Sequence, residues 1–320
     1  MRFTLSLADI EAARERIATH VKRTPLARSD VLSRRLGTNV YLKAELFQKT
    51  GSFKVRGAFN KMLPLRRGDR VAAVSGGNHA QAVAYAGHVL GLETLIFMAE
   101  TTPRNYVDAT RGYGAEVVFV RTAIEGFDLL DAHAAKGWVP VHPFKDPFVM
   151  AGHGTAGLEI IEDVPEITDC IVSIGGGGLI SGVSTAIKER VPSARVWGVE
   201  TDGADCMSRA LAAGKPVTMT AITSIAKTLG APSASDETLA IVQRNVESVT
   251  VVSDAEALAA LRFLLERTKM LTEAAASCTL AAAERLRAQL GEHVVLLLCG
   301  GNMAVADLCQ ALATSAIAST

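Results

Sequence analysis

The sequence predicts an α/β protein built from mainly parallel sheets that are flanked by helices. Apolar runs rich in Val, Ile and Leu alternate with longer runs rich in Ala and Leu along most of the 320 residues, as expected for parallel strands covered on both faces. Glycine-rich stretches follow several of the strand-like runs, and ligands bind at this end of the strands in such sheets. The same alternation therefore predicts the fold class and the edge of the sheet that carries the site.

Seven short apolar runs predict strands, and six longer runs predict helices. The predicted strands span residues 39–46, 70–76, 93–99, 116–120, 170–175, 195–200 and 293–301. The predicted helices span residues 77–91, 102–114, 127–137, 178–191, 254–268 and 277–290. Residues 215–247 are the least regular part of the chain, and we expect a lid-like loop with a short helix there.

The composition argues against several classes of protein. The chain has 33 basic and 33 acidic side chains, so its net charge gives no reason to expect nucleic acid or an anionic membrane as a partner. No apolar run reaches the ~18–20 residues of a membrane span, and the first residues lack the apolar core of a signal peptide. The five cysteines are scattered without CxxC spacing, which favours a reducing cytoplasm over disulfides or a zinc site.

The stretch KTGSFKVRG, residues 49–57, places Lys54 between a strand-like run and a helix-compatible run. Small residues form a turn before this lysine, and Phe53 directly precedes it. Three interpretations are open: a solvated surface charge, a clamp for a phosphate, or a reactive amine. The surroundings must decide between them, because a lysine becomes a good nucleophile where burial lowers its pKa.

Four consecutive glycines, residues 175–178, follow a predicted strand and precede a predicted helix. Their N–H groups can converge on one anion at the start of the helix, where the helix dipole favours negative charge. The spacing fits neither the G-x-G-x-x-G fingerprint nor a Walker P-loop. A tight turn is the alternative, but four glycines destabilise a chain through backbone entropy, so we favour a phosphate site.

Two further glycine-rich stretches end predicted strands. SGGNH, residues 75–79, offers N–H groups and a hydroxyl to a carboxylate, or it simply begins a capped helix. In CGGN, residues 299–302, Cys299 is either a buried core thiol, as free cysteines usually are, or a residue that faces a ligand. Together with the loop of Lys54, these stretches are expected to surround one crevice at the ends of the strands.

Taken together, these motifs resemble the fold-type II pyridoxal phosphate enzymes, in particular the threonine and serine dehydratases and serine racemases. The matching stretches are KTGSFKVRGA (49–58), SGGNHAQA (75–82), HPF (142–144), GHGT (152–155), GGGGLISG (175–182) and CGGN (299–302). The resemblance implies a two-domain fold like that of the tryptophan synthase β subunit. A large cofactor-binding domain, residues 1–66 plus 147–320, would carry an inserted small domain, residues 67–146.

By this resemblance, Lys54 bonds covalently to pyridoxal phosphate and later removes the α-proton of the substrate. The implied cofactor-binding residues are Phe53, Lys54, Asn78, Gly175, Gly176, Gly177, Gly178, Glu273 and Cys299. The implied substrate-binding residues are Thr50, Ser52, Ser75, Gly76, Gly77, Asn78, His79 and His153. The family usually has Gln where this chain has His153 and Pro where it has Ala274. His153 is therefore either a core histidine or a residue that reaches the substrate.

The resemblance also implies a divalent cation site made by a Glu, a main-chain carbonyl and an Asp. Glu200 and Ala204 match the first two ligands, but Cys206 stands in the last place. Mg²⁺ and Ca²⁺ prefer oxygen ligands, so a thiolate is a poor replacement. A bound Mg²⁺-type cation and a solvated acidic turn are the two alternatives.

The implied reaction is β-elimination of water from a β-hydroxy-α-amino acid of the L-threonine or L-serine type, which gives a 2-oxo acid and ammonia. Serine racemases carry a Ser where this chain has Gly76, and a glycine has no side chain to deliver a proton. We therefore favour a dehydratase. The alternatives are a dehydratase of 3-hydroxyaspartate or another hydroxylated amino acid, a racemase, a β-replacement synthase and a non-enzymatic binding protein. We expect a cytoplasmic homodimer without nucleic-acid or membrane partners.

Overall fold

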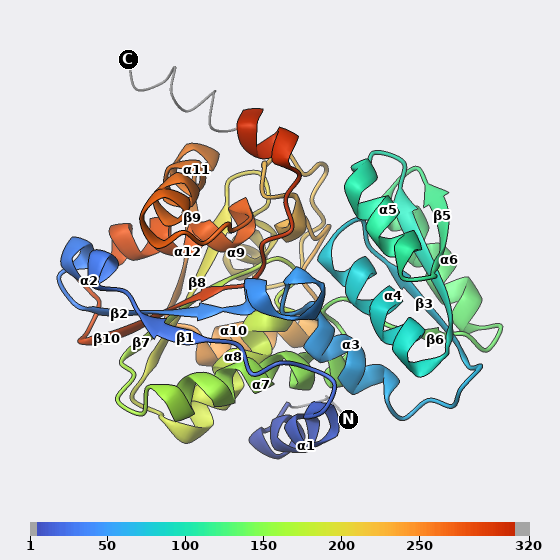
Figure 1. Ribbon diagram of the computed structural model, residues 1–320, viewed down its shortest axis with the longest axis horizontal. Coiled ribbons are helices and arrows are strands. Elements are labelled where there is room, and N and C mark those ends of the chain that lie inside the picture. Colours follow the sequence, from blue (N-terminus) through green and yellow to red (C-terminus); the bar gives the residue numbers. More distant parts are fainter. Residues whose placement is uncertain (1–4, 311–320) are drawn as a thin grey trace.

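The computed structural model describes residues 5–310, so residues 1–4 and 311–320 of the predicted large domain lie outside the described range. The chain forms two lobes, each built around its own sheet (Figure 1). Within the described range, no helix combines the length and apolar character needed to cross a membrane. The predicted α/β class with mainly parallel sheets is confirmed.

The larger lobe contains a six-stranded sheet in the order β1-β2-β10-β7-β8-β9. Its strands are β1 (Leu26–Arg28), β2 (Asn39–Ala44), β7 (Asp169–Ser173), β8 (Arg195–Thr201), β9 (Ser248–Val252) and β10 (His293–Leu298). All neighbouring strands run parallel except β1, which pairs antiparallel with β2. In β10 the side chains from Val294 to Leu298 are fully buried, as expected for a strand covered on both faces.

The smaller lobe contains a four-stranded parallel sheet in the order β5-β4-β3-β6. Its strands are β3 (Arg70–Val74), β4 (Glu93–Ala99), β5 (Glu116–Val120) and β6 (Val139–Pro140). The sequence did not predict β1, β6 or β9. Strands β1 and β6 have only three and two residues, which is too short for a periodic pattern. Strand β9 is a Val-rich run whose composition does fit a strand.

Helices cover both faces of the larger sheet. In Figure 1, α11 and α12 lie above this sheet, and α7 and α8 lie below it. The helices before and within the smaller lobe are α1 (Leu7–Ile17), α2 (Asp30–Leu36), α3 (Lys54–Met62), α4 (Asn78–Leu90), α5 (Arg104–Gly112) and α6 (Ala123–Ala134). The later helices are α7 (Pro147–Asp163), α8 (Gly178–Arg190), α9 (Cys206–Ala213), α10 (Asp236–Asn245), α11 (Asp254–Phe263) and α12 (Ala274–Leu286).

Residues 215–247 contain a short 3-10 turn, η3 (Lys227–Leu229), and the ten-residue helix α10. Helix α10 begins with a capping box, in which Ser235 and Thr238 satisfy each other's main-chain N–H groups. The expectation of a loop with a short helix is confirmed, and a lid-like movement of this segment stays a prediction.

Helix α3 joins the two lobes. It lies in the chain segment predicted for the large domain, but Phe59 and Met62 share a hydrophobic core with Val71 and Ile96 of the smaller sheet. On another side, α3 packs against α7 of the larger lobe. The predicted domain boundaries at 66/67 and 146/147 stay a prediction, and the helix that begins at Lys54 is anchored in both lobes.

The sequence did not predict α7, although this helix has 17 residues. Its glycines lower the intrinsic helix propensity, but close packing requires them. A Cβ atom on Gly152 would lie 2.5 Å from the main-chain oxygen of Arg56, and one on Gly154 would lie 2.9 Å from that of Gly182. The glycines therefore allow α7 to approach the backbones of α3 and α8, and tertiary packing outweighs propensity.

Candidate active site

Lys54 is the first residue of α3, and its side chain is half-buried. Its Nζ donates a hydrogen bond to the carbonyl oxygen of Pro143 at 2.9 Å and lies 5.1 Å from the ring centre of Phe53. Burial lowers the pKa of Lys54 to about 8, although Cys299 and Glu273 act to raise it. At pH 7 about 9% of such an amine is unprotonated, against about 0.03% at an ordinary lysine pKa. These surroundings favour a reactive amine over a solvated charge.

Main-chain hydrogen bonds hold the lysine loop against the loop that follows β10. The N–H of Phe53 donates to the carbonyl of Cys299 at 3.1 Å, and the N–H of Gly301 donates to the carbonyl of Gly51 at 3.0 Å. Burial raises the pKa of the Cys299 thiol well above its usual range. Cys299 therefore stays a neutral thiol close to the amine of Lys54.

Asn78, at the start of α4, contacts Glu273, which directly precedes α12. The Nδ2 of Asn78 donates to Oε1 of Glu273 at 2.8 Å, and Oε2 of Glu273 is buried without a hydrogen-bond partner in the described residues. Burial raises the pKa of Glu273 to about 7, although hydrogen bonding and Lys54 act to lower it. In the loop before α4, the N–H of Gly77 donates to the hydroxyl of Ser75 at 3.1 Å, which tightens the turn.

The four-glycine stretch connects β7 to α8, as predicted, and its last residue, Gly178, is the first residue of α8. Gly177 is the N-cap of α8 and adopts a left-handed conformation, with φ 93°. A Cβ atom on Gly176 would overlap the ring of Phe144, and one on Gly178 would lie 2.9 Å from the Cα of Phe144. Only glycine fits this close approach, and the N–H groups at the start of α8 are suited to an anion.

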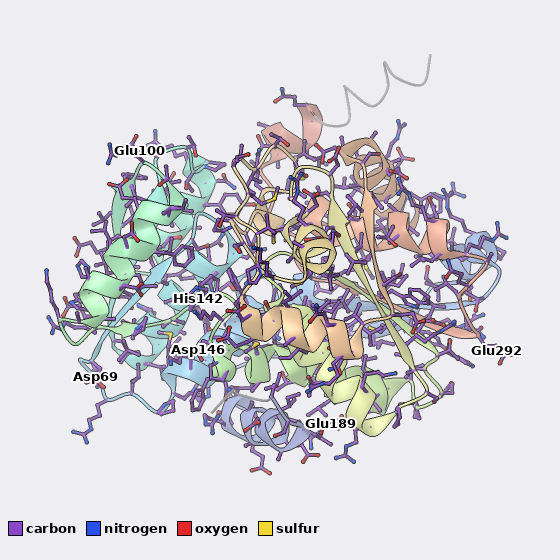
Figure 2. The ribbon with its side chains drawn as sticks, turned by 180° about the vertical axis from the view of Figure 1, so that it is seen from behind. Asp69, Glu100, His142, Asp146, Glu189 and Glu292 are labelled. Atoms are coloured by element: carbon purple, nitrogen blue, oxygen red, sulfur yellow. The ribbon has the colours of Figure 1, made fainter. Side chains whose placement is uncertain are left out.

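Two histidines near the lysine are uncharged at neutral pH. The Nε2 of His79 donates to the carbonyl of Val141 at 2.8 Å, and burial lowers the pKa of His79 to about 3. The Nδ1 of His142 accepts hydrogen bonds from the N–H groups of Phe144 and Lys145, and desolvation lowers its pKa to about 3. Figure 2 shows His142 where the smaller lobe meets the larger one. Neither ring is a charged imidazolium at neutral pH, so neither can act as a general acid in that form.

His153, on α7, is fully buried under the lysine loop. Its ring packs edge-on against the ring of Phe53, with 4.7 Å between the ring centres. Burial lowers the pKa of His153 well below its usual range, although a hydrogen bond with the main chain of Gly178 acts to raise it. This geometry favours a packing residue that supports Phe53, and contact of His153 with the substrate stays a prediction.

The implied cation ligands precede α9: Glu200 lies near the end of β8, and Ala204 lies in the turn between β8 and α9. The two carboxylate oxygens of Glu200 accept hydrogen bonds from the N–H groups of Met207 and Ser208, each at 2.8 Å, and burial raises the pKa of Glu200 to about 7. Ala204 lies in the preceding turn, and the thiol of Cys206 donates to a main-chain carbonyl. Among the described residues, no three His, Cys, Asp or Glu side chains are grouped to hold a metal. A cation at Glu200 and Ala204 stays a prediction, and it would compete with α9 for the carboxylate.

Several polar atoms of the predicted site residues are buried without partners in the described residues. They are Oγ1 of Thr50, Oγ of Ser52, Nδ1 of His79 and Oε2 of Glu273. Such atoms are rare in folded proteins and call for a ligand or another explanation. These residues fit pyridoxal phosphate and an amino-acid substrate. The glycine loop suits a phosphate, Lys54 offers an amine of lowered pKa, and unpartnered hydrogen-bonding atoms lie nearby.

Comparison with known proteins identifies the family of this chain. The chain matches the family described as "Pyridoxal-phosphate dependent enzyme" over residues 17–300. It is 41% identical to an L-threonine ammonia-lyase of Geobacter sulfurreducens, covering 92% of this chain and 75% of that protein. It is 39% identical to a phenylserine dehydratase of Ralstonia pickettii, covering 97% and 98%. The structure of maize serine racemase superposes with a TM-score of 0.91 at 32% identity and covers 99% of both chains.

The chain therefore belongs to the pyridoxal-phosphate-dependent enzyme family. The expected fold-type II architecture and the expected cofactor are confirmed by this membership and by the structural similarity. The expected class of reaction, that of a lyase in the threonine and serine dehydratase group, is confirmed by the relatives. The roles of individual site residues stay predictions.

Several residues around the site were given no role by the sequence. Pro143 accepts the hydrogen bond of Lys54, and Phe144 packs on the glycine loop. Both belong to the HPF stretch, whose match to the family was a usable signal. Asn302, the last residue of CGGN, donates hydrogen bonds to two site residues, and Tyr106 contacts Asn302 from α5. No local pattern points to Tyr106, because its partner is far away in the sequence.

Replacing Gly176 with alanine is expected to weaken binding of pyridoxal phosphate by about 5- to 150-fold, because overpacking costs about 1–3 kcal/mol. The added methyl group overlaps Phe144, so either this ring or the phosphate loop must move. Fluorescence titration of the cofactor-free protein measures the dissociation constant. Gly112→Ala is the control, since nothing lies within 4 Å of its added Cβ atom. Wild-type affinity in Gly176→Ala would show that this loop does not hold the phosphate.

Proposed function

We propose that this protein is an ammonia-lyase that eliminates water from a β-hydroxy-α-amino acid, with L-threonine and L-serine as the preferred candidates, and releases a 2-oxo acid and ammonia. One observation carries the proposal: the amine of Lys54, with its pKa lowered to about 8, lies near the neutral thiol of Cys299. A thiol does not force protonation of the pyridine nitrogen, as a carboxylate does. The weaker electron sink favours elimination over reactions that need a long-lived carbanion.

When bound, pyridoxal phosphate supplies an aldehyde that captures amino groups and an electron-withdrawing ring. Lys54 would hold the cofactor through Nζ and, once the substrate amine has released it, would take the α-proton at the same nitrogen. The N–H groups of the four-glycine loop would hold the phosphate, and Asn78 would bind the ring hydroxyl. Phe53 would cover one side of the cofactor and exclude water, while Glu273 would approach the ring.

The substrate would be held by the unpartnered polar atoms around the lysine. The hydroxyls of Thr50 and Ser52 and the N–H groups of the Ser75–His79 loop suit its carboxylate. His79 has a further use. Because its Nε2 donates to a main-chain carbonyl, its Nδ1 is an acceptor, and an acceptor suits the β-hydroxyl of the substrate better than the carboxylate.

The relatives and the charges around the lysine support a substrate with an uncharged side chain. The two relatives compared above are named for threonine and phenylserine, which both carry a hydroxyl on the β-carbon. A 3-hydroxyaspartate substrate would bring a second carboxylate, which needs a cation. His79 and His142 have pKa values of about 3 and provide no charge at neutral pH. 3-Hydroxyaspartate is therefore the weaker candidate.

Racemisation is the second candidate function, and one contact gives it a specific test. A Cβ atom on Gly76 would lie 2.5 Å from the hydroxyl oxygen of Thr102. The hydroxyl of Thr102 thus fills the space into which a side chain at position 76 would extend. If the protein exchanges serine enantiomers, Thr102 is the candidate proton carrier, and Thr102→Val would stop the exchange and spare elimination.

A panel of amino acids tests the proposed function. Purified protein loaded with pyridoxal phosphate is incubated with L-serine, D-serine, L-threonine and both 3-hydroxyaspartate diastereomers. Release of 2-oxo acid and ammonia and the enantiomer of the remaining substrate are measured. We expect equal amounts of 2-oxo acid and ammonia from L-threonine or L-serine, without D-enantiomer. Rapid formation of D-serine from L-serine would make the protein a racemase. No product from either L-amino acid would overturn the proposed substrates while leaving the cofactor in place.

We also propose a cytoplasmic homodimer. The five cysteines are free thiols, which suits a reducing compartment, and relatives of this fold are expected to pair. Light scattering after gel filtration should give twice the mass of one chain. A monomeric mass for the active protein would contradict the dimer.

A further inference from the structure

Asn302, in the loop after β10, connects three elements around the proposed site. Its Nδ2 donates one hydrogen bond to the carbonyl of Thr50 at 2.7 Å and another to Oδ1 of Asn78 at 2.8 Å. The main-chain carbonyl of Asn302 accepts a hydrogen bond from the hydroxyl of Tyr106 at 2.5 Å. Asn302 therefore contacts the lysine loop, the start of α4 and helix α5 of the smaller lobe.

The amide of Asn302 fixes the orientation of the Asn78 amide. An amide side chain has one accepting oxygen and one donating nitrogen. Because Oδ1 of Asn78 accepts from Asn302, its Nδ2 is directed to Glu273, to which it donates at 2.8 Å. Without Asn302, the Asn78 amide would lose the partner that distinguishes its two ends.

Asn302 also supports the strained backbone before Lys54. Thr50 has φ 63°, a left-handed conformation that residues other than glycine rarely adopt. Gly51 has φ 71°, and a Cβ atom there would overlap the side chain of Asn302. The hydrogen bond from Asn302 to the Thr50 carbonyl thus holds the unusual turn that places Lys54 at the start of α3.

The hydroxyl of Tyr106 ties the two lobes together. Tyr106 is 9% exposed and lies on α5, which packs against α4 in the smaller lobe, whereas Asn302 follows a strand of the larger sheet. Burial raises the pKa of Tyr106 above its usual range. The hydroxyl therefore keeps its proton at neutral pH and can donate it to the carbonyl of Asn302.

We propose that Tyr106 and Asn302 are positioning residues for the reaction: Tyr106 ties α5 to the loop after β10, and Asn302 then orients Asn78 and the lysine loop around the cofactor. The kinetic consequences rest on the proposed function, whereas the consequences for cofactor binding require only that pyridoxal phosphate binds. Loss of the hydrogen bond between Tyr106 and Asn302 lets the lobes separate more easily, and this weakens the binding of substrate and cofactor. It leaves the proton transfer by Lys54 intact.

Tyr106→Phe removes only the hydroxyl and tests the tie. We expect the KM for the hydroxy amino acid and the dissociation constant of pyridoxal phosphate each to rise about 3- to 10-fold, as for one lost hydrogen bond. We expect kcat to change less than about twofold, since the chemical step is unaffected. Tyr85→Phe is the control. Tyr85 packs edge-on against Phe59 and Tyr113 within the smaller lobe, and both constants should stay at wild-type values.

Asn302→Ala tests the second half of the proposal. This change keeps the main-chain carbonyl to which Tyr106 donates, so it removes only the two bonds to Thr50 and Asn78. We expect a loss of cofactor affinity of about tenfold or more, because two hydrogen bonds are lost, together with a shifted absorption band of the bound cofactor. In Tyr106→Phe/Asn302→Ala, the combined loss should be smaller than the product of the single losses, because both changes act through one residue.

Two results would overturn the proposal. One is a Tyr106→Phe protein with a lower melting temperature but unchanged KM and cofactor affinity, because the hydroxyl would then be merely structural. The other is a double variant whose losses multiply, because the two residues would then act independently. If the wild type binds pyridoxal phosphate but converts no hydroxy amino acid, the proposed function fails, and the cofactor titrations alone decide on the positioning residues.

Discussion

Replacing Lys54 with alanine is expected to lower kcat/KM for the hydroxy amino acid by more than about 10³-fold, since a general base alone contributes about 10²–10⁴-fold. The change removes both the amine that attaches the cofactor and the base that takes the α-proton. The visible absorption band of the cofactor-loaded wild type should also be lost. Steady-state release of 2-oxo acid and an absorption spectrum measure the two effects.

Lys49→Ala is the matched control, because Lys49 is a lysine of the same loop with no place in the proposed site. It should bind the cofactor and form 2-oxo acid near the wild-type rate. Wild-type turnover in Lys54→Ala would show that another group supplies the reactive amine. Equal losses in both variants would indicate damage to the loop rather than loss of a catalytic amine.

Arg56, two residues after Lys54, lies in a buried cluster of four charged side chains. Its guanidinium donates to both carboxylate oxygens of Glu45, each at 2.8 Å, and to those of Glu159 at 2.7 and 2.8 Å. The Nζ of Lys43 donates to Glu159 at 2.5 Å. The two positive charges of the cluster thus equal its two negative charges. Arg56 connects the first turn of α3 to α7 and to the residues after β2.

Replacing Arg56 with alanine is expected to lower the free energy of unfolding by about 3–5 kcal/mol, because it leaves buried carboxylates without their partner. Burial acts to raise the pKa of Glu45, but Arg56 holds it below its ordinary value. The contribution of the cluster is therefore present at neutral pH and is lost as the pH falls below the ordinary glutamate range. Urea unfolding at pH 7 measures the loss, and Arg56→Lys, which keeps the charge, should lose less.

The matched control for this prediction is a similar ion pair at the surface. Arg285 donates to both oxygens of Glu256 at 2.7 and 2.6 Å, but the two side chains are 46% and 37% exposed. Arg285→Ala should cost no more than about 1 kcal/mol, as exposed pairs do. Equal destabilisation by the two arginine substitutions would contradict the role given to burial.

The strands and the edge of the sheet that carries the site were predictable because both leave local patterns. A continuous apolar run predicts β10, and four glycines after an apolar run predict the loop between β7 and α8. Lys54 was found through its motif, and the structure adds the physical reason why its amine is reactive. These features depend on neighbouring residues in the chain, so a single sequence displays them.

The remaining features depend on contacts between distant segments. Helix α7 was missed because its glycines oppose helix formation locally, whereas the backbones of α3 and α8 require them. The hydrogen bond between Tyr106 and Asn302 joins residues 196 positions apart, and the cluster around Arg56 joins three separate segments. Hydrophobic periodicity carries no information on such pairs.

Peptide mapping after borohydride reduction tests the central claim, that Lys54 is the amine that bonds to pyridoxal phosphate. Reduction fixes the cofactor on its lysine, and digestion with trypsin followed by mass spectrometry locates it. We expect the added mass on the peptide of residues 50–56, which lies between the cleavage sites at Lys49 and Arg56 and stays uncut at the modified Lys54. Added mass on a peptide with a different lysine, or none in protein that has bound the cofactor, would show that Lys54 is not the amine that bonds to pyridoxal phosphate.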